Sequence, residues 1–149
     1  MNRASYVSNI RTLLQDQEIY NELLGGKEEL TDSEITLALM MELEYYNNVP
    51  PALDQYELED FPAPYQLING AAGRSLLSVC NRHDRNRLEY NDGGVSVRVN
   101  DKADRYRPMA AAMLQEWREF VLRHKVSRNM AGFTDTYSPM GRGRGTYDI

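Results

Sequence analysis

The longest run of regularly spaced hydrophobic positions lies toward the C-terminal end of the chain. Apolar and aromatic side chains, followed by a histidine, recur there every three or four residues: Tyr106, Ala110, Met113, Trp117, Val121 and His124. This spacing places them along one face of a helix. We expect the helix to run from about Arg107 to Lys125. Pro108 would then occupy its first turn, where a missing N–H costs little, and residues 101–106 would form a leading turn or a kinked extension.

The N-terminal part of the chain predicts one or two amphipathic helices. The first covers residues 4–16 and takes Ser5 as its N-cap, because a serine hydroxyl can accept a hydrogen bond from a free amide of the first turn. Residues 17–24 either continue this helix or form a second short one. Gly25 and Gly26 end it, since glycine adopts the left-handed C-cap conformation at little cost.

The most hydrophobic helix is expected to follow Thr31 and to run to about Asn47. Thr31 and Glu34 have the spacing of a capping box, in which each side chain accepts a hydrogen bond from the other residue's amide. Apolar residues occur on nearly all sides of this helix. It is therefore either the central core helix or a helix with one side in the core and the other against another subunit. Pro50 and Pro51 end it, because residues before proline avoid the helical region, and an acidic loop with prolines follows to Pro64.

A helix with many small residues is expected over about residues 65–81. Gly70 and Gly73 each cost about 1 kcal/mol of helix propensity relative to alanine, so we expect them to allow another helix to approach closely. Residues 88–99 then alternate between apolar and polar positions on both sides of residues 91–94, Asn-Asp-Gly-Gly. This pattern predicts a β-hairpin at about residues 87–99. Because a two-stranded ribbon alone is marginally stable, it should lie on helices or on other subunits.

The end of the chain, residues 130–149, has no periodicity and contains four glycines. We therefore predict a helical domain over residues 1–129 and an extended C-terminal arm over residues 130–149. The arm should bind a partner through its large and basic side chains. These are Phe133, Tyr137, Met140, Arg142, Arg144, Tyr147 and Ile149. The predicted fold class is mainly α, a bundle of four to five helices with one hairpin and this arm.

Length and composition favour one domain: 149 residues with a hydrophobic content of 42 % can bury a substantial core. One cysteine excludes an intramolecular disulfide framework and fits a reducing cytoplasm. We find neither an apolar signal segment nor a run of about 20 apolar residues, so we expect no membrane association.

The net charge of −5 is unevenly distributed along the chain. Residues 1–62 contain three basic and thirteen acidic residues, a net charge of −10, whereas residues 63–149 contain fourteen basic and nine acidic residues, a net charge of +5. This is either an ordinary solvated surface or a chain whose acidic half contacts the basic half of a neighbouring copy. Head-to-tail contacts of the second kind close into rings.

Candidate catalytic and metal-binding residues are few. Cys80 and His83 have a C-x-x-H spacing, but a zinc site needs about four ligands, and the other histidine is His124. A nucleophilic Cys80 beside either histidine would lack a glycine-rich oxyanion turn. The acidic loop with Asp54, Glu57, Glu59 and Asp60 matches no calcium-loop spacing. We therefore predict no catalytic residue, no metal site and no cofactor, with Cys80 as a buried thiol.

Basic residues mark two further candidate surfaces. The densest cluster, expected to face phosphate or an acidic neighbour, consists of Arg82, Arg85, Arg87 and Arg98. The segment from Gly141 to Gly145 alternates glycine with arginine, as do segments that bind single-stranded nucleic acid. Two arginines in an acidic chain make this second indication weak.

The order of the predicted elements resembles that of the head–tail connector, or adaptor, proteins of tailed bacteriophages. The likeness is one of layout: amphipathic helices, a buried helix ending in Tyr-Asn-Asn-Val-Pro-Pro, a small-residue helix, a hairpin, a long helix and an arm. Residues 35–51 and 69–129 carry most of it. The resemblance implies a virion structural protein without catalytic residues, assembled in the host cytoplasm. It also implies a ring, typically of twelve copies, that docks beneath the portal protein, contacts tail and neck proteins and passes DNA through its lumen without sequence-specific binding.

Other functions fit parts of the sequence. Within structural proteins, the alternatives are another neck, tail-completion or minor capsid component. From a different class, a small nucleic-acid-binding regulator would use Arg82, Arg85, Arg87 and the arginine–glycine segment, and its affinity for DNA would fall steeply with salt. An enzyme built on Cys80 comes last, because no substrate suggests itself.

Overall fold

The computed structural model describes residues 1–21, 25–51, 55–86, 88–92, 95–99 and 102–136; both strands and residues 132–136 are described by their backbone only. This part of the chain is mainly helical and contains four helices, within the four to five that the sequence predicts. The elements are α1 (Arg3–Leu14), α2 (Asp32–Asn48), α3 (Pro64–Arg85), β1 (Leu88–Asp92), β2 (Val95–Val99) and α4 (Lys102–Thr136). In the described residues, no helix combines the length and apolar character that a membrane crossing requires.

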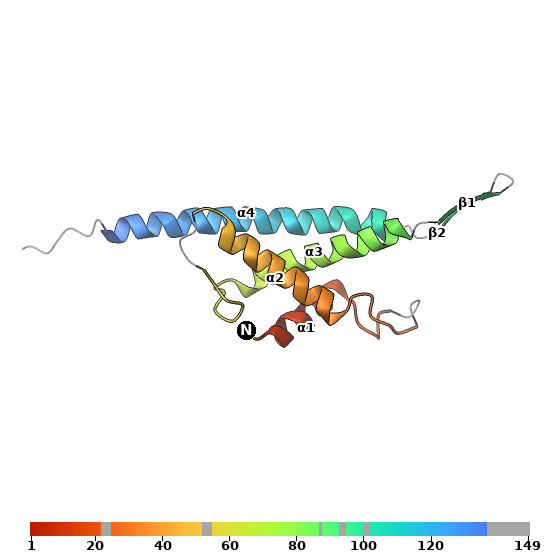
Figure 1. Ribbon diagram of the computed structural model, residues 1–149, viewed down its shortest axis with the longest axis horizontal. Helices are drawn as coiled ribbons and strands as arrows, with labels where there is room; N and C mark the ends of the chain where they lie inside the picture. The colour runs from red at the N-terminus through yellow and green to blue at the C-terminus, as the bar shows by residue number, and fades with distance from the viewer. Residues whose placement is uncertain (22–24, 52–54, 87, 93–94, 100–101, 137–149) are drawn as a thin grey trace, which may run out of the picture.

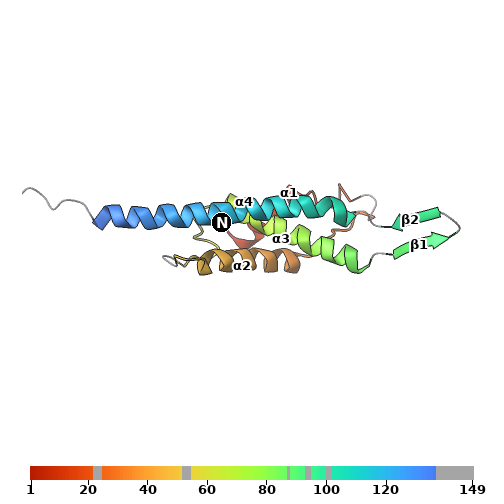
Figure 2. The ribbon, with the colours of Figure 1, turned by 90° about the horizontal axis from the view of Figure 1, so that it is seen from above.

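Helices α3 and α4 form the long axis of the molecule (Figure 1). They run in opposite directions, since Cys80 near the end of α3 contacts Ala103 at the start of α4, while Gly70 lies against Trp117. Helix α2 packs on α3, and α1 packs on both α2 and α3. From above, α3 lies between α2 and α4 (Figure 2). The central helix is therefore α3. The first alternative for α2, that it is the central core helix, is wrong, because Leu37 and Met41 of α2 are exposed; the second, a contact with another subunit, stays a prediction.

The glycines of α3 allow α4 to come close, as predicted. A Cβ atom added at Gly70 would lie 2.6 Å from Cγ of Trp117, and one added at Gly73 would lie 3.0 Å from Cβ of Met113. A separation of 2.6 Å is far inside van der Waals contact, so the position of the Trp117 ring requires glycine at residue 70. Close packing thus accounts for a residue type that weakens an isolated helix.

The core joins all four helices around Trp117. Its indole ring is fully buried, with its centroid 6.1 Å from that of Phe61 and 5.7 Å from that of Phe120. The predicted stripe of α4 supplies four buried residues, namely Ala110, Met113, Trp117 and Val121. Replacing a buried aromatic side chain of this size by alanine costs about 3–5 kcal/mol, so this stripe carries a large share of the stability.

Both predicted ends of α2 are confirmed, and both predicted ends of α1 are wrong. Thr31 and Glu34 form the expected capping box, and α2 ends at Asn48 with Val49 as its C-cap. Helix α1 is capped by the side chain of Asn2, which accepts from the amide of Ser5, so Ser5 itself is not the N-cap. Helix α1 already ends at Leu14, and its C-cap Gln15 adopts a left-handed conformation with φ 55°. The described residues 17–21 are not helical and contain a turn at residues 18–20.

The two long helices extend beyond their predicted ends. Helix α3 continues from the expected residue 81 to Arg85, and α4 starts at Lys102 and ends at Thr136. Pro108 therefore lies inside α4 and not in its first turn, which corrects the expected start. Its side of the helix is exposed, so water can bond the backbone carbonyl that loses its N–H partner. The expected boundary between domain and arm, at residues 129 and 130, falls within α4.

Strands β1 and β2 pair antiparallel, with a register from Leu88 opposite Val99 to Asp92 opposite Val95. The glycines expected in the turn, Gly93 and Gly94, lie outside the described residues. The paired strands project from the end of the molecule where α3 stops and α4 begins, while the C-terminal part of α4 projects from the opposite end (Figures 1 and 2).

Candidate functional site

The structure describes the side chains of only two residues of the predicted basic cluster, Arg82 and Arg85. Arg82 donates to the backbone carbonyl of Glu29 at 2.7 Å and forms an ion pair with Glu34. It therefore ties α3 to the start of α2 and to the loop before it. Arg85 is exposed at the end of α3. Arg87 lies outside the described residues, as does the side chain of Arg98. The structure thus gives Arg82 an acidic neighbour within its own chain.

Cys80 and the two histidines do not form a reactive group. The thiol of Cys80 is fully buried, its Sγ lies 3.6 Å from the carbonyl oxygen of Ala103, and burial raises its pKa. Nε2 of His83 lies 2.6 Å from a carboxylate oxygen of Glu29. His124 contacts Tyr46 on the other side of the molecule. The described residues contain no group of three or more side chains suited to hold a metal ion.

His124 belongs to an aromatic cluster at the end of α2. Its Nδ1 lies 2.7 Å from the hydroxyl of Tyr46, and its ring stacks on Phe120 with centroids 5.3 Å apart. Burial lowers the pKa of His124 below its ordinary value of 6.5, and the nearby cations Arg128 and Lys125 lower it further. Lys125 is itself buried: its Nζ lies 4.5 Å from the centroid of the Tyr46 ring and 3.3 Å from the carbonyl oxygen of Pro51.

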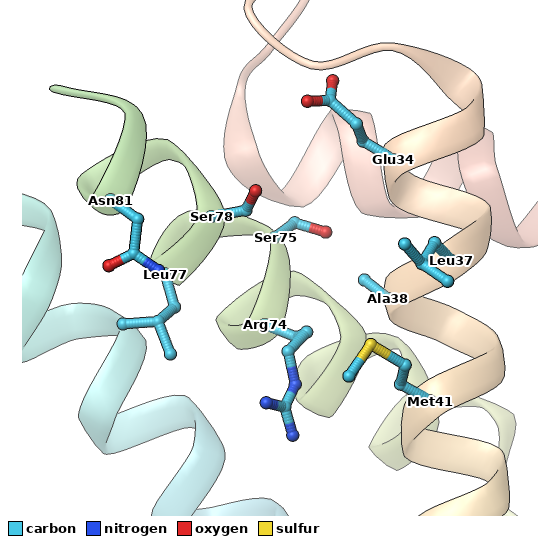
Figure 3. A pocket seen from close by; sticks show the side chains of 9 residues that line it. All are labelled: Glu34, Leu37, Ala38, Met41, Arg74, Ser75, Leu77, Ser78 and Asn81. Carbon is cyan, nitrogen blue, oxygen red and sulfur yellow. The ribbon is translucent and has the colours of Figure 1, made fainter. Parts of the chain in front are cut away.

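A groove between α2 and α3 is the first of two depressions beside α2 (Figure 3). Its apolar lining consists of Leu37, Ala38, Met41 and Leu77. Both of its charged groups are paired: Arg74 binds the buried Glu42 with a distance of 2.6 Å, and Glu34 binds Arg82. The hydroxyl of Ser75 is buried there without a hydrogen-bond partner among the described residues. The groove is therefore apolar and without net charge.

The second depression, which we call the acidic groove, lies between α2 and the loop before α3. Its apolar surface is formed by Met40, Leu43, Tyr56 and Leu58, and its charged lining residues are Arg3, Glu44, Glu57 and Glu59. The three carboxylates are exposed and form no ion pair with the described residues. With three acidic and one basic residue, the lining carries a net charge of −2. An apolar floor with an acidic rim suits a basic amphipathic segment.

A third surface, which we call the α4 stripe, lies on the exposed side of the C-terminal half of α4. Leu122, Val126 and Met130 follow one another every four residues and are 53 %, 55 % and 64 % exposed. Arg123 and Ser127 line the same surface. Sequence reasoning missed this stripe, although its spacing of four is visible once the helix is extended past Lys125. Apolar side chains in a row on a projecting helix are typical of a surface that contacts another molecule.

The predicted arm residues are largely beyond what the structure describes. Phe133 lies in the last turns of α4, and its side chain is outside the described residues. Tyr137, Met140, Arg142, Arg144, Tyr147 and Ile149 also lie outside them. Comparisons with protein-family models, with curated proteins and with solved structures found no match to this chain.

Proposed function

We propose that the protein is a structural adaptor of a tailed-bacteriophage neck, a ring of identical copies between the portal protein and the tail. The observation that carries this proposal is the apolar row on the C-terminal half of α4, where Leu122, Val126 and Met130 are each more than half exposed. A helix that projects with an apolar row gains stability when another chain covers the row. This supports a protein that completes its structure in an assembly.

The shape of the molecule adds to this support. The paired strands project at one end and α4 projects at the other, so each copy offers two separate extensions to its neighbours (Figure 1). Following the resemblance, we assign the ring twelve copies. The hairpin and the arm of residues 130–149 reach other subunits or the portal, and DNA passes through the lumen. Another neck, tail-completion or minor capsid component is the alternative within the same class.

The nucleic-acid-binding regulator is less well supported than the adaptor. Of its proposed residues, Arg82 is engaged by Glu34 and Glu29 within the chain and Arg85 is exposed, while Arg87 and the arginine–glycine segment lie outside the described residues. Neutralised cations contribute little to phosphate binding. DNA affinity that falls steeply with added salt would nevertheless favour the regulator over the adaptor.

The proposed function is tested by mixing the purified chain with portal rings from the same phage. Native mass spectrometry should detect a complex of one portal ring with a fixed number of copies of this chain, and electron microscopy should place them as a ring on one face of the portal. Free monomers in the absence of the portal do not contradict the proposal, because an adaptor can assemble on the portal alone. A compact monomer at every concentration, with and without the portal, would refute it.

A further inference from the structure

The α4 stripe and the acidic groove carry opposite charges. The exposed charged residues between Arg118 and Met130 are three arginines and one glutamate, a net charge of +2, because Lys125 of this segment is buried. The segment from Asp32 to Asp60, which forms α2 and the loop beside it, contains eight acidic residues and no basic one. Both surfaces also present apolar side chains at their centres. Their charge and hydrophobicity are therefore complementary.

Within one chain the two surfaces cannot meet. The stripe lies on the exposed side of a continuous helix, which contacts α2 and its loop through His124 and Lys125 and whose end leaves the body of the molecule (Figure 1). Bringing Met130 back to Met40 would break α4, which costs its backbone hydrogen bonds. The groove of a second copy is open to the stripe without any change of fold.

We propose that the α4 stripe of one copy docks in the acidic groove of a second copy, with Leu122 and Val126 against Met40 and Tyr56. Arg118 then faces Glu57 and Glu59, and Arg123 exchanges its exposed ion pair with Glu119 of the same helix for one with these carboxylates. The neutral groove between α2 and α3 is the less suitable site, because its charged residues Glu34 and Arg74 already have partners. This inference rests on the proposed function and deepens it by assigning the two surfaces through which neighbouring copies meet.

The contact is head to tail, because it joins two different surfaces of identical chains. After a first contact, one copy keeps a free groove and the other keeps a free stripe, so copies add in one direction until a ring closes. A symmetric pairing of stripe with stripe would stop at two copies. The number of copies in the assembly therefore distinguishes the head-to-tail contact from the pairing of stripe with stripe.

The test uses charge reversal on either side of the contact, in the full chain. The basic-side variant carries Arg118→Glu and Arg123→Glu, the acidic-side variant carries Glu57→Arg and Glu59→Arg, and a third variant carries all four. Self-association is measured by analytical ultracentrifugation, and folding by circular dichroism. Each one-sided variant should raise the dissociation constant by at least about tenfold. The variant with all four substitutions should recover most of the lost affinity.

Matched controls keep the result specific. Arg105→Glu reverses an exposed arginine at the other end of α4, and Glu18→Arg reverses an exposed glutamate outside the groove; both should associate like the parent chain. Val126→Asp places a carboxylate in the stripe at a residue that is 55 % exposed, so it should weaken association without loss of helical signal.

Four results would overturn the inference. These are unchanged association in either one-sided variant, failure of the variant with all four substitutions to recover, equal loss in the control variants, and a parent chain that stays monomeric up to millimolar concentration. None of them refutes the adaptor function, which is decided by binding to the portal. Conversely, a parent chain that pairs through these surfaces and ignores the portal would refute the adaptor function and keep the contact.

Discussion

At the scale of single residues, a group of buried charges holds the segment between α1 and α2. Arg11, which is almost fully buried, contacts Asp16, Glu28 and Asp32 at distances of 3.3, 3.0 and 2.6 Å. Asp16 also accepts from the backbone amides of Glu29 and Leu30 at 2.7 and 2.9 Å. Because Asp16 satisfies two amides and one guanidinium at once, it fixes the path of the chain into α2.

Asp16→Ala should lower the free energy of unfolding by about 3 kcal/mol, since it leaves Arg11 buried with one partner fewer and two amides without an acceptor. Urea denaturation followed by circular dichroism measures the change. Asp60→Ala, a matched change at an exposed position, should stay within about 0.5 kcal/mol of the parent. Equal effects of the two substitutions would show that Asp16 has no special role in the loop.

The stability should also depend on pH through His124. Its pKa is lowered in the folded chain by burial and by the cations Arg128 and Lys125, so the unfolded chain binds a proton at a pH at which the folded chain does not. The free energy of unfolding then falls as the pH drops below the ordinary value of 6.5, and the effect levels off below the lowered pKa. Above that ordinary value both states are neutral and the effect is absent.

His124→Gln should remove this part of the pH dependence. The difference in the free energy of unfolding between about pH 8 and about pH 5.5, which bracket the ordinary histidine pKa, should be smaller in the variant than in the parent chain. The midpoint of urea denaturation at each pH is the measurement. If parent and variant lose the same stability on acidification, another group is responsible.

At the scale of elements, the sequence predicts best what depends on local spacing. The capping box at Thr31 and the buried stripe around Trp117 follow from residues within a few turns of one another, and both are confirmed. The ends of α4 depend on tertiary contacts. Helix α4 begins before Pro108 and buries Ala103 beside Cys80, a contact that helix propensity alone could not show.

The candidate site was harder to predict for the same reason. The partners of Arg82 are Glu34 and Glu29, which precede it in the chain by 48 and 53 positions. No local sequence pattern predicts a pairing over such a distance. The acidic groove likewise forms only where the loop of residues 56–59 folds against α2. The α4 stripe, by contrast, can be recognised from the sequence, because its apolar residues are spaced four positions apart.

The contact of α3 with α4 gives a test at this scale. Gly70→Ala should destabilise the protein by about 1–3 kcal/mol, because overpacking against the Trp117 ring exceeds the gain in helix propensity of about 1 kcal/mol. Gly73→Ala should cost less, since its nearest atoms lie at 3.0–3.1 Å. Ser78→Ala, at an exposed position of α3, is the control and should change stability by less than about 0.5 kcal/mol. The midpoint temperature of thermal unfolding is the measurement. A Gly70→Ala variant more stable than the parent chain would contradict the close contact of residue 70 with the Trp117 ring.

At the scale of the whole molecule, part of the uneven charge distribution is used within the chain. Glu29 and Glu34, from the acidic half, pair with His83 and Arg82 of the basic half. The charges that have no such partner among the described residues include Glu57 and Glu59 on one side and Arg118 on the other. In the contact that we propose between copies, these unpaired charges meet across the acidic groove and the α4 stripe.

Two truncations separate the end of α4 from the residues beyond it. Removing residues 130–149 deletes the last seven of the 35 residues of α4, including Met130. Removing residues 137–149 leaves α4 whole. The shorter deletion should keep self-association, because Leu122, Val126 and Met130 all remain. The longer deletion should abolish assembly and leave the helical signal nearly intact, because the core around Trp117 is untouched. Native mass spectrometry and circular dichroism give the two readouts. Assembly that survives removal of residues 130–149 would show that neither the arm nor the end of α4 holds neighbouring copies together.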